Sequence, residues 1–175
     1  EIRGWNILSD NIEIAEETIY YAKNYNINHL QLSHHLIHNL KEVSDKSKLK
    51  TIKHLTTLAH NVGIEKVFIW DHALYNKSYY PREFFNKKTD QLNLDNQDFW
   101  KWFKEDYKNK LEKIKMIDGI VLTFIETGMR IENQYSKLYP SSTQKFKKLI
   151  KELNSVVNLH FGMDLILRTF SYNDS

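Results

Sequence analysis

Acids, imidazoles and aromatic side chains recur where the short apolar runs of this sequence end. In the segment GIVLTFIETG, apolar and β-branched residues lead directly to Glu126. The run KVFIWD ends on Asp71, and His72 follows it. A carboxyl group above apolar layers is partly desolvated, which raises its pKa and suits a general acid near neutral pH. We therefore predict Glu126 and Asp71 as catalytic residues, with Glu126 as the general acid.

Other side chains near these ends are typical of carbohydrate recognition. Flat aromatic rings stack on the C–H faces of sugars, whereas His, Asp, Asn and Arg bind hydroxyls and carboxylates. Arg168 can bind a uronate carboxylate in a bidentate manner, or it can pair with Glu126. Trp5 and Trp70 can alternatively be core residues beneath the loops, and Asp71 can cap the segment that follows it. The predicted substrate-binding residues are His34, His35, His72, Arg168, Trp5, Trp70, Tyr75 and Arg130.

The segment SHHLIH, residues 33–38, raises the question of a metal site. Two imidazoles four positions apart on a helix can chelate a metal, but a helix is doubtful here and no carboxylate stands at a fixed spacing. We therefore predict hydrogen bonding for these histidines, no metal and no cofactor. The alternative is a sugar isomerase or epimerase that holds a divalent ion with Glu126, Asp71, His72 and His34.

Strands and helices are predicted to alternate along the chain. Helical periodicity and capping residues indicate helices over about 10–24, 46–61, 98–115 and 141–157. Between them, residues 73–96 form a long irregular stretch rich in tyrosine and phenylalanine, of the length that is usually functional in compact domains. Apolar runs predict strands over residues 4–9, 29–33, 66–71, 164–170 and the segment that begins at Gly119.

This alternation predicts an α/β fold with a parallel sheet covered by helices. No glycine-rich phosphate loop follows the first strand, where the sequence reads ILSDNIE, which weakens a nucleotide-binding doubly wound sheet. A complete (β/α)8 TIM barrel needs about 250 residues, so we expect the N-terminal part of one, about five strands and four helices. Strand alternation then predicts Ile120, Leu122 and Phe124 on the inner face below Glu126. The rival architecture is a complete open five-stranded sheet.

The composition excludes several classes of protein. With 41% hydrophobic and 13% aromatic residues, the chain is not typical of a disordered protein. The formal charge of +3 is spread along the sequence, so we predict no nucleic-acid partner. No apolar run approaches the ~20 residues that span a bilayer, so no membrane association is predicted. The absence of cysteine excludes disulfides and thiolate nucleophiles. Localisation stays open, although a secreted or periplasmic protein is favoured if a leader was removed before Glu1.

The segment FWKWFKEDYKNKLEKIKMIDGIVLTFIETG, residues 99–128, resembles the fourth β/α stretch of the α-glucuronidases of glycoside hydrolase family 67. In that family an aromatic-rich helix leads into a strand that ends in an acid and a glycine, and a tyrosine-containing loop follows, here MRIENQYSKLYP. The resemblance implies a TIM-barrel hydrolase of O-glycosyl bonds in a carbohydrate, such as a uronic-acid-containing polysaccharide. It also implies that Glu126 protonates the glycosidic oxygen.

The number of strands and helices leads to further expectations for the whole chain. Residues 1–175 would be a partial catalytic domain with the remainder of the barrel beyond residue 175. The second catalytic carboxylate would then lie in that remainder, so we expect this chain alone to be inactive. The rest of its own barrel, or a second copy, would cover the open sheet edges. A non-catalytic carbohydrate-binding scaffold is the further alternative.

Overall fold

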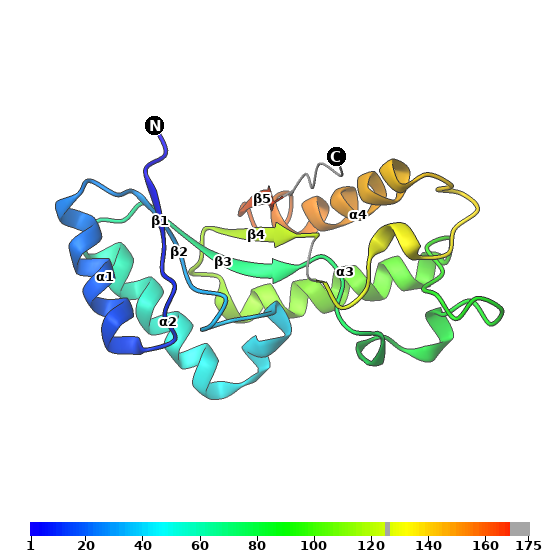
Figure 1. Cartoon of the computed structure of the whole chain (residues 1–175), viewed down its shortest axis with the longest axis horizontal. Coiled ribbons are helices and arrows are strands. Elements are labelled where there is room, and N and C mark those ends of the chain that lie inside the picture. Colours follow the sequence, from blue (N-terminus) through cyan, green and yellow to red (C-terminus); the bar gives the residue numbers. More distant parts are fainter. Residues whose placement is uncertain (125–126, 169–175) are drawn as a thin grey trace, which may run out of the picture.

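The computed structural model describes residues 1–124 and 127–168 of the chain. Its strands form one five-stranded, all-parallel sheet in the order β1-β2-β3-β4-β5, so each strand pairs with the next one in the sequence (Figure 1). The predicted α/β fold with a parallel sheet and four helices is confirmed. The strands are β1 (Gly4–Asn6), β2 (His29–Gln31), β3 (Lys66–His72), β4 (Gly119–Thr123) and β5 (Asp164–Arg168).

The four helices begin where the sequence offers capping side chains. Asn11, rather than Asp10, caps the first helix, and Asp45 accepts hydrogen bonds from the backbone of the second helix. Ser141 and Gln144 form a complete capping box at the start of the fourth. None of the described helices is both long and apolar enough to cross a membrane. The helices are α1 (Ile12–Asn24), α2 (Lys46–Asn61), α3 (Gln97–Leu111) and α4 (Ser142–Val157).

Short 3₁₀ helices occupy several of the connections between these elements. They are η1 (Leu40–Ser44), η2 (Lys77–Tyr79), η3 (Arg82–Phe84), η4 (Glu112–Ile114) and η5 (Ile131–Asn133). Two of them lie in the long connection between β3 and α3. Its aromatic residues pack on α3: the rings of Tyr80 and Phe84 lie 6.2 Å and 5.8 Å from the ring of Phe99. Most of its aromatic residues therefore extend the core.

One face of the sheet carries the helices. Val67, Ile69, Ile120 and Leu122 belong to the main core, together with the buried residues of all four helices. The alternate residues Phe68, Trp70 and Val121 form a separate small cluster on the opposite face. Right-handed crossovers between strands taken in consecutive order place every helix on the same side of a sheet. We call the opposite side the helix-free face.

This arrangement corrects one expectation. The prediction that Ile120, Leu122 and Phe124 lie on the inner face is wrong, because Ile120 and Leu122 pack under the helices. Phe124 does so as well, with its ring 5.1 Å from that of Phe146 in α4. Val121 is the residue of β4 that joins Phe68 and Trp70 on the helix-free face.

The sheet is curved around its helix-free face. Residues from all five strands line one hollow of about 510 Å³ there, with β1 and β5 both contributing although they are the two edges of the sheet. Parallel strands twist relative to their neighbours, and the twist accumulates across a sheet into curvature of this kind. The hollow is lined by Ile2, Gly4, Trp5, Asn6, His29, Leu30, Gln31, Phe68, Val121, Ile166, Leu167 and Arg168.

Candidate functional site

Polar side chains form a row across the carboxyl ends of three strands. His72 of β3 pairs in register with Thr123 of β4, and Thr123 pairs with Arg168 of β5. The preceding row on the same face contains Trp70, which belongs to the helix-free cluster. Residues in register share a face of a sheet, so these side chains meet at the carboxyl end of the helix-free face. In parallel α/β architectures this is the end at which ligands bind.

Arg168 covers the ring of Trp70 in this row. The guanidinium carbon lies 4.5 Å from the ring centroid, the geometry of a cation–π contact. His34 and His72 complete the group, with ring centroids 6.1 Å and 6.2 Å from that of Trp70. His35 lies against His34 at 4.2 Å. Five of the predicted substrate-binding residues are thus gathered in one place, and we call His34, His35, Trp70, His72 and Arg168 the carboxyl-end cluster.

A small polar cavity of about 210 Å³ adjoins the carboxyl-end cluster. The loops that follow β2, β3 and β4 all contribute to it, and the ring of His38 lies 4.6 Å from that of His72 on its wall. As far as the structure describes the chain, this wall contains donors and imidazoles but no carboxylate. The cavity is lined by His38, Asn39, Lys41, His72, Tyr75, Asn76, Thr127 and Gly128.

Gly128 allows the loop after β4 to approach the loop after β3. A Cβ atom at position 128 would lie 2.4 Å from the backbone nitrogen and the side-chain oxygen of Asn76. Such distances are well inside van der Waals contact, so only glycine fits. This close approach brings Thr127, the residue after Glu126 in the sequence, to the cavity wall.

Asp71 lies on the helix side of β3 and is fully buried, with 0% of its surface exposed. Its carboxylate accepts hydrogen bonds from the backbone N–H of Leu40 at 2.8 Å, from the Tyr75 hydroxyl at 2.9 Å and 3.1 Å, and from the Tyr107 hydroxyl at 2.8 Å. Burial raises the pKa of Asp71, although these hydrogen bonds and the charge of Lys110 act in the opposite direction. The arrangement joins η1, the β3 loop and α3, which supports a structural role for Asp71.

Hydrogen bonds to Asp71 and Tyr80 hold Tyr75 in place. Its hydroxyl points to Asp71, and burial together with the neighbouring carboxylate raises its pKa well above the usual value. Its backbone N–H donates to the hydroxyl of Tyr80 at 2.9 Å. Tyr75 therefore contributes to the floor of the small cavity as a fixed residue, and its ring is largely buried.

Trp5 and Arg130 are not part of the carboxyl-end cluster, although Trp5 lines the same hollow as Arg168. The Trp5 ring packs against Tyr25, which ends α1, at 5.4 Å. Arg130 is 70% exposed and forms an ion pair with Glu132 at 2.6 Å. Glu126, the predicted general acid, lies outside the described residues.

Some residues of this region were not singled out from the sequence. Lys41, Asn76 and Thr127 line the small cavity from the loops that follow three different strands. Asn76 and Thr127 stand a few residues beyond the carboxyl end of a strand, so position was their only signal, whereas Lys41 lies much further along, in η1. Tyr107 is one of the buried residues of α3, and its hydroxyl bond to Asp71 left no trace in the sequence pattern.

The histidines of the region do not form a recognisable metal centre in the described part of the chain. No three His, Cys, Asp or Glu residues among residues 1–124 and 127–168 come together as a set of metal ligands. The ligand set of the isomerase alternative includes Glu126, which lies outside the described residues.

Comparison of the sequence with models of protein families finds no match, and neither does comparison with curated protein sequences. The fold alone defines the class of this protein: an α/β domain with a curved, all-parallel sheet and consecutive strand order.

Proposed function

We propose that this chain is part of a (β/α)8-barrel glycoside hydrolase that acts on a uronic-acid-containing carbohydrate. The barrel hypothesis is supported by three features: the consecutive strand order, the helices gathered on one face, and the hollow lined by all five strands. An open doubly wound sheet normally reverses its strand order and carries helices on both faces. The helix-free face would then be the barrel interior, and the carboxyl-end cluster would lie at its mouth.

The contact between Arg168 and Trp70 is the observation that carries the proposed substrate class. The indole ring is largely buried, so it supports the guanidinium rather than stacking on a sugar itself. The guanidinium above it is a planar donor that matches a carboxylate in a bidentate manner. Histidines next to this pair supply hydrogen-bonding groups for hydroxyls. A charged sugar such as a glucuronate presents both a carboxylate and hydroxyls to these groups.

Glycoside hydrolysis further requires two carboxyl groups that flank the scissile bond. In this proposal Glu126 protonates the leaving oxygen, and its partner is not Asp71, since Asp71 is buried beneath the helices. The second carboxylate would come from further strands of the barrel. We therefore expect the present chain alone to bind its substrate without turning it over.

A carbohydrate-binding scaffold without catalysis is the second candidate. It is favoured by the burial of Asp71 and by the lack of a carboxylate in the described wall of the small cavity. Both candidates predict binding of an acidic sugar. They differ in whether a protein that contains further barrel strands cleaves aryl uronides.

Titration of the chain with glucuronic acid and with glucose tests the proposal. We expect saturable binding of glucuronic acid, at least about tenfold tighter than that of glucose, because a charge-assisted bond to Arg168 is added. Equal affinity for the two sugars, or no binding of either, would contradict the proposed substrate class. Aryl uronides then test hydrolysis by a protein that contains further barrel strands, with Glu126→Gln as the control, and turnover that survives this substitution would remove Glu126 from the mechanism.

A further inference from the structure

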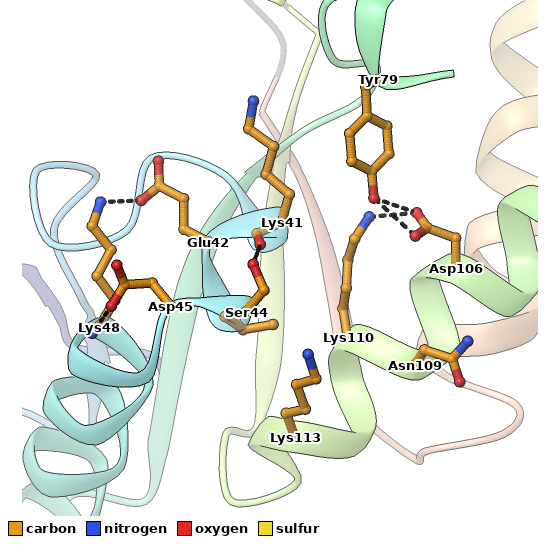
Figure 2. A pocket seen from close by; sticks show the side chains of 11 residues that line it. Lys41, Glu42, Ser44, Asp45, Lys48, Tyr79, Asp106, Asn109, Lys110 and Lys113 are labelled. Atoms are coloured by element: carbon orange, nitrogen blue, oxygen red, sulfur yellow. Dashed lines mark hydrogen bonds and ion pairs between the residues drawn. The ribbon is translucent and has the colours of Figure 1, made fainter. Parts of the chain in front are cut away.

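A second hollow lies on the helix side of the protein, away from the carboxyl-end cluster. It has a volume of about 610 Å³ and lies between η1 with the start of α2 on one side and the second half of α3 with η4 on the other. Figure 2 shows its side chains, four of which are lysines. The hollow is lined by Lys41, Glu42, Val43, Ser44, Asp45, Lys48, Tyr79, Asp106, Asn109, Lys110 and Lys113. We call it the lysine groove.

Two of the four lysines are neutralised within the protein. Lys48 pairs with Glu42, and Lys110 pairs with Asp106 at 2.5 Å. The other two, Lys41 and Lys113, form no ion pair with any described residue, and in Figure 2 no dashed line reaches either ammonium group. With Asp45 as a third acid beside Glu42 and Asp106, the groove has four lysines against three carboxylates, an excess of one positive charge.

The acids of the groove are already engaged. Asp106 accepts from Lys110 and from the Tyr79 hydroxyl at 2.8 Å and 2.9 Å. Asp45 caps α2 through two backbone N–H groups. Because these carboxylates are held by fixed partners, they favour neither a bound cation nor a new pair with Lys113.

Lys41 and Lys110 also lie close to each other around one aromatic ring. Their ammonium nitrogens are 5.6 Å and 4.7 Å from the centroid of the Tyr75 ring. Lys110 is only 9% exposed, and burial is the main reason that its pKa is lowered, with the charge of Lys41 acting in the same direction. Two like charges near one ring repel, and an anion placed between η1 and α3 relieves that repulsion.

We propose that the lysine groove is an anion-binding site for a small phosphorylated ligand, with Lys41 and Lys113, at two ends of the groove, supplying the positive charge that attracts it. A lysine ammonium binds phosphate oxygens as a compact point charge, and Asn109 adds a neutral donor to the same wall. The volume leaves room for an organic group attached to the phosphate. The groove lies on the opposite side of β3 from Trp70 and Arg168, and it shares Lys41 with the wall of the small polar cavity.

Calorimetric titration with inorganic phosphate and with glycerol phosphate tests the site. Three proteins are compared: the unaltered chain, the double variant Lys41→Gln/Lys113→Gln, and a matched control, Lys87→Gln/Lys88→Gln. The control removes the same charge from two exposed lysines outside the groove. All of these positions are outside the buried core, so the variants are expected to fold, and circular dichroism checks this.

We expect saturable binding to the unaltered chain and to the control, and at least about tenfold weaker binding to the groove variant, because two charge-assisted bonds are lost. Absence of saturable binding to the unaltered chain would overturn the proposal. Equal weakening in the control would show attraction to net charge rather than a site. An Arg168→Gln variant should leave phosphate affinity unchanged, and loss of binding there would instead place the anion at the carboxyl-end cluster.

Discussion

Arg168 lies with its guanidinium carbon 4.5 Å from the centroid of the Trp70 ring, and this contact joins β5 to β3 across the helix-free face. The two residues are separated along the sheet by β4, whose residues at this level, Val121 and Thr123, are small enough to leave room between them. A cation–π contact contributes about 0.5–2 kcal/mol, depending on how far it is desolvated. Trp70 is largely buried, so its contact with Arg168 orients the guanidinium as well as adding stability.

The first prediction concerns Arg168→Gln and Trp70→Ala. Removal of the guanidinium should weaken binding of glucuronic acid at least about tenfold while leaving the affinity for glucose nearly unchanged, because only the acidic sugar offers it a carboxylate. Trp70→Ala should also weaken binding of glucuronic acid, since it removes the ring that orients the guanidinium. Calorimetric or NMR titration measures these affinities. A uniform loss for both sugars in Arg168→Gln would argue that this residue acts only on folding.

The second prediction concerns the buried acid. In Asp71→Asn an amide NH₂ replaces one carboxylate oxygen and faces the donors of Leu40, Tyr75 and Tyr107. We expect the free energy of unfolding to fall by about 2–4 kcal/mol, because buried donors lose a charged acceptor. Urea denaturation followed by circular dichroism measures the change.

Asp98→Asn is the matched control for this substitution, because Asp98 is exposed at the start of α3. It should change stability by no more than about 0.5 kcal/mol. Should Asp71→Asn prove equally harmless, the assigned structural role of Asp71 would have to be abandoned.

The third prediction concerns acid sensitivity at Asp95. Burial acts to raise the pKa of Asp95, but bonds from the Ser136 hydroxyl and from the backbone N–H groups of Lys137 and Leu138 outweigh it, so the pKa is lowered from 3.8. A carboxyl with a lowered pKa in the folded state stabilises the fold fully above its unfolded value. It loses that contribution as the pH falls through its folded value.

Asp95→Asn should therefore be less stable than the unaltered protein at pH 7, and the difference should shrink below about pH 4. Urea denaturation at a series of pH values gives this difference directly. If the difference in unfolding free energy between Asp95→Asn and the unaltered protein stays constant down to about pH 2.5, the charge of Asp95 makes no contribution to stability.

The fourth prediction concerns the floor of the hollow. A Cβ atom at Gly119 would lie 2.3 Å from the ring of Phe68 and 2.6 Å from the carbonyl oxygen of Asp164. Gly119→Ala should destabilise the protein by about 1–3 kcal/mol, because the added Cβ would push the Asp164 carbonyl out of the pairing of β5 with β4. Gly4→Ala is the control in the same sheet, since its Cβ would meet His29 at an ordinary 3.5 Å. Thermal unfolding compares the two variants, and equal effects would mean that the central strands yield more readily than their packing indicates.

The elements could be predicted because their signals are local. Capping residues such as Asp45 and Ser141 mark where helices begin, and Gly63, with its φ of 97°, follows the end of α2. The face of each strand could not be predicted in the same way. A parallel strand buried on both sides is apolar throughout, so Ile120 and Val121 look equivalent in the sequence although they face opposite ways.

Because the sequence does not indicate which face a strand residue occupies, only some of the predicted site residues lie together in the structure. Strand ends correctly indicated where polar groups would gather, and His72 and Arg168 do meet in one row. Asp71 and His72 are neighbours in the sequence, so they necessarily point to opposite faces, and the sequence alone could not say which one faces the helices. The partners of Asp71 were equally hidden, because Tyr107 follows it by 36 positions.

The hydrogen bond from the Leu40 backbone N–H to the Asp71 carboxylate joins η1 to β3 across 31 positions of the chain. Insertions on the two sides of Leu40 should therefore differ in their effect on the fold. An insertion just before Leu40 would leave the bond and the helix cap intact but would displace Leu36 and Ile37, which are buried in the core. An insertion between Leu40 and Asp45 would displace either the bond to Asp71 or the cap of α2, so these two contacts together fix the length of η1.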